Sequence, residues 1–99
     1  MNRENGPLPR EAAETLALEA LAFLIGDEKL GPMFLAASGI APRDLAARAS
    51  EASVLVSVLN FLMQDDAWLR DFCHATRRSL TDPQRALWGL PGGAEIHWT

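Results

Sequence analysis

Cys73 and His74 are the one neighbouring cysteine–histidine pair that could bind a metal ion or act together in catalysis. Adjacent residues on a helix point about 100° apart, so this thiol and this imidazole cannot share one ion or one proton. His97 is too distant in the sequence to be inferred as a third member. We therefore expect a buried structural thiol at Cys73 and a solvated imidazole at His74.

Two adjacent carboxylates, Asp65 and Asp66, could form a general acid–base pair. Their position at the expected start of a helix favours capping, because an aspartate there accepts hydrogen bonds from unpaired backbone N–H groups. Gly26, Gly31 and Gly39 lack the spacing and the preceding strand of a phosphate-binding loop. The sequence thus predicts no enzyme, cofactor, metal site or small-molecule substrate.

Size and charge restrict the class of protein. A chain of 99 residues with 48% hydrophobic content predicts a single domain over residues 1–99. The net charge of −4 disfavours a nucleic acid or an anionic membrane as partner. The lone Cys73 excludes an intrachain disulfide, the acidic N-terminal segment does not resemble a signal peptide, and the uncharged run over residues 52–64 is too short to span a bilayer. We expect a cytoplasmic protein that binds another protein or self-associates.

An internal match relates two parts of the chain, with Leu59 following Leu21 by 38 positions. This match predicts two copies of one helical hairpin packed together. Chance similarity is the alternative, because Leu, Ala and Phe are common in amphipathic helices. The matched residues are Leu21, Phe23, Leu24, Asp27, Phe34 and Ala37, which recur as Leu59, Phe61, Leu62, Asp65, Phe72 and Ala75.

Hydrophobic periodicity predicts the first three helices. A one-sided helix is expected over residues 10–25. The second should begin at Pro32, because proline inside a helix removes a hydrogen bond, although Asp27 could cap a short first turn; it should end at Gly39. A short third helix should cover residues 42–49. The second helix should bury Leu30, Met33, Phe34 and Ala37.

The helix predicted over residues 52–63 is the centre of the fold. Ser50 is a suitable cap, and apolar residues surround most of the helix, so it must be covered on nearly every side. Two more helices should follow. One runs from residue 65 or 66 to 77–78, and a last short one follows Thr81, Asp82 and Pro83, carries Trp88 inward and stops at Gly89. The predicted fold is an all-α bundle of five to six short helices, with two hairpin-like units around the central helix. Residues 1–9 should form a loose arm and residues 90–99 a tail.

Uncharged polar residues form a narrow stripe along this otherwise apolar helix. Ser53, Ser57, Asn60 and Gln64 lie at positions i, i+4, i+7 and i+11. The stripe faces solvent or bonds to neighbouring helices, or else it forms the floor of a groove or a dimer contact, since small uncharged side chains cost little to desolvate when partnered.

The tail has an alternating pattern. Ala94, Ile96 and Trp98 alternate with polar residues, which predicts an extended strip with one apolar face. This strip either folds back on its own helices or docks on another chain with Trp98 as anchor. Ile96 and Trp98 therefore join the four stripe residues as candidate partner-binding residues.

A DNA-binding regulator is the alternative function. The turn at Gly39 between two short helices resembles a helix-turn-helix, in which Arg43 and Arg48 would contact DNA. The intervening Asp44 and the acidic net charge weaken the attraction to phosphate.

The runs LALEALAFL, FLAASGIAPRDL, SVLNFL and DDAWLRDF resemble a family of small bacterial proteins grouped as domain of unknown function 3572, over about residues 11–87. The resemblance implies a compact all-helical fold and provides no catalytic residues to carry over, because the family has no established activity. This sequence departs from the family pattern at Pro32, at Arg77, where a glycine is expected, and in the GGAEIHWT tail. We therefore expect a non-enzymatic protein-interaction or regulatory module.

Overall fold

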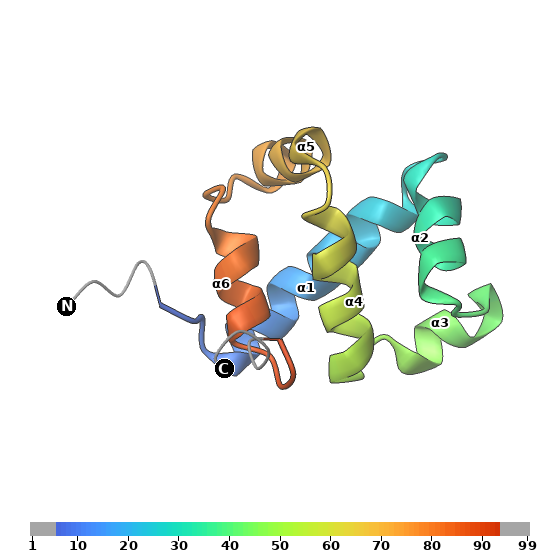
Figure 1. Ribbon diagram of the computed structural model, residues 1–99, viewed down its shortest axis with the longest axis horizontal. Helices are drawn as coiled ribbons and strands as arrows, with labels where there is room; N and C mark the ends of the chain where they lie inside the picture. The colour runs from blue at the N-terminus through green and yellow to red at the C-terminus, as the bar shows by residue number, and fades with distance from the viewer. Residues whose placement is uncertain (1–5, 94–99) are drawn as a thin grey trace.

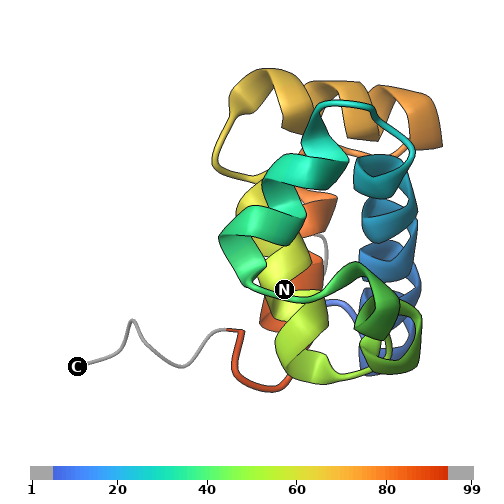
Figure 2. The same ribbon diagram turned by 90° about the vertical axis from the view of Figure 1, so that its right-hand side faces the viewer.

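The computed structural model describes residues 6–93, which form six α-helices and no strand. Helices α1 and α4 pack against each other at the centre, and α2 and α6 each pack against both of them. Helix α5 lies across one end of the bundle (Figures 1 and 2). The predicted all-α bundle is confirmed. The helices are α1 (Arg10–Ile25), α2 (Leu30–Ser38), α3 (Pro42–Arg48), α4 (Ala52–Leu62), α5 (Asp66–Thr76) and α6 (Asp82–Trp88).

Helix α4 is the buried centre, as its all-round apolar sequence predicts. The prediction that Ser50 caps it is wrong: the N-cap is Glu51, which has extended backbone angles and makes no side-chain cap. The Glu51 carboxylate instead accepts a hydrogen bond from Arg48 Nε at 3.1 Å. The buried residues of α4 are Val54, Leu55, Val58, Leu59, Phe61 and Leu62.

An aspartate makes the same pair of hydrogen bonds at the start of the second helix of each hairpin, although the N-cap residue of α2 is Lys29, which makes no side-chain cap. Asp27 Oδ1 accepts hydrogen bonds from the backbone N–H groups two and three residues later, at 2.8 and 2.9 Å. Asp65 Oδ1 makes the equivalent pair at 2.8 and 3.1 Å. Helix α2 therefore begins at Leu30 and not at the predicted Pro32, because proline is tolerated in a first turn, where its missing N–H has no partner to lose.

Aromatic rings link the two hairpins reciprocally. Phe23 on α1 packs edge to face on Phe72 of α5, with ring centroids 5.6 Å apart and planes at 70°. Phe61 on α4 packs on Phe34 of α2 with the same 5.6 Å separation, at 71°. Exchanging each residue for its match 38 positions away turns one pair into the other. The 38-residue match therefore relates these two ring contacts. It does not extend to the helix packing, because α6 packs closely on α1 whereas the matching helix α3 packs little on α4.

The matched helices also end alike. Gly39, after α2, has φ of 74°, as its predicted role as a left-handed terminator requires, and its N–H donates to the Leu35 carbonyl at 3.0 Å. Arg77, after α5, has φ of 59°, and the Arg78 N–H donates to the Cys73 carbonyl at 2.9 Å. An L-residue in this conformation costs about 1–2 kcal/mol. Arg77 thus bears a strain that glycine would not.

Three apolar residues that the sequence predicts to be buried are exposed. Met33 and Ala37 are exposed, because α2 contacts the core only through a narrow face. Trp88 is 38% exposed, because α6 buries Ala86 and Leu87 on its other side.

Parts of the predicted arm and tail belong to the packed fold. The Leu8 N–H donates to the Arg85 carbonyl at 3.0 Å, which holds the segment before α1 against α6. Leu90 is only 4% exposed and packs in the core. The Leu8 hydrogen bond and the burial of Leu90 join distant segments and leave no periodic pattern in the sequence, so the sequence does not predict them. Residues 1–5 and 94–99 lie outside the described part of the chain.

Candidate interaction surface

Cys73 and His74 do not form a reactive pair. Cys73 is 2% exposed, and its thiol donates to the Ser79 carbonyl at 3.5 Å, whereas His74 is exposed. Burial raises the pKa of the Cys73 thiol, the nearby Asp82 raises it further, and Arg78 partly opposes them. The thiol is therefore the buried structural group that the sequence predicts, held in its protonated form.

The adjacent carboxylates serve the helix start. Asp65 is the N-cap of α5, as predicted, and Asp66 is the exposed first residue of that helix. Within residues 6–93, no three His, Cys, Asp or Glu side chains are grouped so that they could hold a metal ion.

Helix α3 carries the two arginines of the DNA-binding alternative. It has seven residues, none of them buried. Arg43 is exposed, and Arg48 forms its ion pair with Glu51, so part of the local positive charge is neutralised. Among the described helices, none alone is long and apolar enough to cross a membrane; α3 and α4 reach that length and composition only together, and they meet at 115°.

The polar stripe lies along the open side of α4. Ser53, Asn60 and Gln64 are exposed, and Ser57 is half-buried. The Ser57 hydroxyl donates to the Ser53 carbonyl at 3.0 Å, so this side chain is partly satisfied by its own helix. The stripe thus faces outward, and Ser57 bonds within its own helix and not to a neighbouring one.

Three of the stripe residues also line a shallow hollow, which we call the polar hollow. It has a volume of about 200 Å³ and lies between α2 and α4. Phe34 and Phe61 supply its aromatic part, while hydroxyl and amide groups supply hydrogen-bonding capacity. The predicted groove alternative therefore has a physical basis at this end of the stripe. The lining residues are Phe34, Ala37, Ser38, Ser57, Asn60, Phe61 and Gln64.

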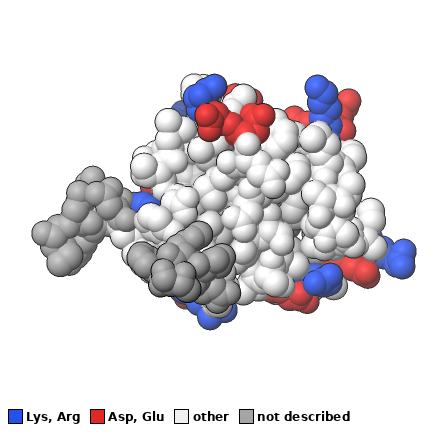
Figure 3. All heavy atoms as spheres, in the orientation of Figure 1, with Lys and Arg blue, Asp and Glu red and all other residues white. Residues whose placement is uncertain are grey.

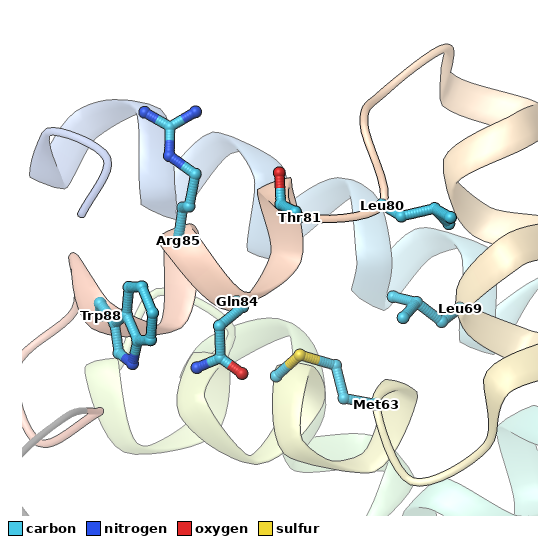
Figure 4. A pocket seen from close by; sticks show the side chains of 7 residues that line it. All are labelled: Met63, Leu69, Leu80, Thr81, Gln84, Arg85 and Trp88. Atoms are coloured by element: carbon cyan, nitrogen blue, oxygen red, sulfur yellow. The ribbon is translucent and has the colours of Figure 1, made fainter. Parts of the chain in front are cut away.

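A larger hollow, which we call the apolar groove, lies on the other side of α4, next to α5 and α6. Its volume is about 490 Å³. Leu80 and Trp88 contribute surfaces that are 53% and 38% exposed. In Figure 4 the Met63 side chain, from the C-cap of α4, and the Gln84 side chain, from α6, extend toward each other. The lining residues are Met63, Leu69, Leu80, Thr81, Gln84, Arg85 and Trp88.

Arg85 is the charged member of the apolar groove, and it is already engaged. Its Nε donates to the Gly6 carbonyl at 2.8 Å, and its guanidinium also lies 3.5 Å from the Asp82 carboxylate. Figure 4 shows the guanidinium apart from the other lining side chains. The groove itself is therefore apolar in character. The sequence does not reveal this groove, because Trp88 is expected in the core and Leu80 belongs to no periodic apolar pattern.

The polar hollow and the apolar groove border the same end of α4. We call the two hollows and the polar stripe together the uncharged face. Of the fourteen residues that line the two hollows, Arg85 is the one that carries a charge. Charged residues make up 22% of the chain. Figure 3 shows the consequence: the surface over α4 and its neighbours is uncharged, and charged side chains gather at the edges of the view.

A second apolar groove lies between α1 and α3, with a volume of about 340 Å³. It is the counterpart of the apolar groove under the same 38-residue match. Leu18 and Ile25 supply its exposed apolar surface. The matched lining residues are Ile25 with Met63, Pro42 with Leu80, and Ala46 with Gln84.

Comparison with known proteins places the whole helical part of the chain in one family pattern. The family model described as "Protein of unknown function (DUF3572)" matches residues 10–93, which include all six helices. Neither the curated proteins nor the solved structures gave a significant match. Ile96 and Trp98, the tail residues of the sequence prediction, lie outside both the described and the matched residues.

Proposed function

The chain belongs to the DUF3572 family, and from this premise we propose that it is a non-enzymatic protein-interaction or regulatory module whose partner binds at the uncharged face. The observation that supports the proposal is the single charge among the fourteen residues that line the two hollows. The centres of protein–protein interfaces are depleted in charged residues and enriched in aromatic residues and methionine.

The two hollows supply different contributions to binding. Trp88 and Met63 offer apolar surface that gains free energy when water is excluded, as anchor residues do. Asn60 and Gln64 offer amide donors and acceptors that can match a partner's backbone. The proposal places the module in the cytoplasm, where a single buried thiol such as Cys73 stays reduced. The partner is another protein or a second copy of this chain.

Substitution of Asn60 by arginine tests the proposal, because it adds one positive charge to the exposed centre of the uncharged face. Thr15→Arg is the matched control: Thr15 is exposed on α1, lines neither hollow, and gains the same charge. Both variants should unfold at the same temperature as the wild-type protein, because surface substitutions change stability by only about 0.5 kcal/mol.

Affinity capture from the native cell lysate, with quantitative mass spectrometry, should show at least about a tenfold loss of the partner for Asn60→Arg, a loss of 1.4 kcal/mol or more. Thr15→Arg should retain the partner. Equal capture by the wild-type protein and Asn60→Arg would refute the proposal. Light scattering of the purified protein tests whether that partner is a second copy.

A further inference from the structure

We propose that residues 94–99 of this chain bind in its own apolar groove, where the Ile96 and Trp98 side chains fill the space lined by Met63, Leu69, Leu80 and Trp88. This intramolecular contact needs no partner and does not rest on the proposed function. A partner that binds the apolar groove must displace this segment, whereas the polar hollow around Asn60 stays open to it. It assigns an occupant to the largest apolar hollow described above.

The first support is the point at which the described chain ends. Gly93 is buried, and its N–H donates to the Leu90 carbonyl at 3.0 Å. Its α-carbon lies so close to the Leu87 carbonyl that a side chain would not fit there. The chain is therefore anchored against α6, the helix that forms one wall of the apolar groove, when it reaches residue 94.

The second support is length. Six extended residues reach about 20 Å. Helix α6 has seven residues and is about 10 Å long. Residues 94–99 can therefore pass along the whole groove, from Trp88 at the end of α6 to Leu80 just before its start.

The third support is chemistry. In an extended segment, alternate side chains face the same way, so Ala94, Ile96 and Trp98 form one apolar edge. Met63 and Trp88 are favourable neighbours for an indole ring, through sulfur–aromatic and aromatic contacts. The polar hollow, lined by amides and hydroxyls, suits this edge less well, and the groove between α1 and α3 includes no residue of α6.

NMR spectroscopy of the purified chain tests the contact through side-chain N–H signals. The Trp88 indole and the Gln84 amide report on the apolar groove, while the Asn60 and Gln64 amides report on the polar hollow. Trp98→Ala should shift the two groove signals and leave the two hollow signals in place, which also shows that the variant is folded. His97→Ala, on the opposite edge of the segment, is the matched control and should move none of the four.

A reciprocal variant tests the other side of the contact. Leu80→Glu places a charge in the groove wall, so it should move the Trp98 indole signal toward its position in a free peptide of residues 94–99. Groove signals that do not respond to Trp98→Ala would overturn the proposal. So would a response that grows with protein concentration, because the segment would then bind a second copy of the chain. The outcome is independent of partner capture by Asn60→Arg, because no partner is present.

Discussion

Replacing Arg77 with glycine and with alanine separates the backbone strain at the end of α5 from the effect of the side-chain charge. Arg77 has φ of 59° and is exposed. Alanine keeps the strain and removes the charge, whereas glycine removes both. Gly39 holds the matching position after α2, with φ of 74°, and a β-carbon built there meets nothing within 4 Å. The two sites therefore allow the same glycine–alanine comparison.

The expected magnitude follows from two opposing effects. The left-handed conformation costs an L-residue about 1–2 kcal/mol. Glycine avoids this cost, but its greater conformational freedom in the unfolded chain lowers the stability of the fold by about 0.4–1 kcal/mol. Arg77→Gly should therefore be about 1 kcal/mol more stable than Arg77→Ala. The wild-type arginine should fall between them, because a positive charge at a helix C-terminus contributes about 0.3–1 kcal/mol.

Urea and thermal unfolding followed by circular dichroism measure this order. For a domain of this size, 1 kcal/mol corresponds to a difference of about 4–8 °C in Tm. Gly39→Ala should lose the same amount relative to the wild-type protein. If Arg77→Ala and Arg77→Gly are equally stable, residue 77 is not held in a left-handed conformation, and the reasoning from the matched hairpins fails at this position.

Four further substitutions test the packing and the Asp27 hydrogen bonds. Phe34→Ala and Phe72→Ala should each lose about 3–5 kcal/mol in urea unfolding, because both rings are buried and each packs edge to face on a second ring; an unchanged stability of either variant would contradict this packing. Gly89→Ala should lose about 1–3 kcal/mol, because its new methyl group would collide with the Leu8 carbonyl, and an unchanged Tm would show that this N-terminal contact does not form. Backbone hydrogen bonds lower the pKa of Asp27 in the folded state, so its carboxylate stabilises the fold above its unfolded pKa, and this contribution is lost as pH falls through the folded pKa. Asp27→Asn should therefore show a shallower loss of stability on acidification than the wild-type protein, and parallel curves would refute the cap.

The sequence predicts those features that depend on local signals. The structure confirms three such features: the burial of the helix predicted over residues 52–63, the cap at Asp65 and the left-handed turn at Gly39. Each follows from a few neighbouring residues. The predicted start of α2 at Pro32 is wrong, because the hydrogen bonds to Asp27 start the helix at Leu30 and leave Pro32 in the first turn, where proline is tolerated.

The candidate surface was predicted only in part, for a different reason. The polar stripe is visible in the sequence because its members share one helix, and Asn60 is among its exposed members. The apolar groove combines α4, α5, α6 and the loop before α6, so no periodicity in one segment reveals it. Trp88 shows the limit: a tryptophan on a short helix favours burial, yet the side that faces the core is set by the packing of α1 and α6.

Site-specific photo-crosslinking in living cells tests most directly whether the uncharged face is the binding surface. A photoreactive amino acid replaces Asn60 in one variant and Thr15 in the other, and both positions are exposed. The proposal predicts a discrete cross-linked protein for the variant at position 60 and none for the variant at position 15. Cross-links at position 15 alone, or equally at both positions, would contradict it.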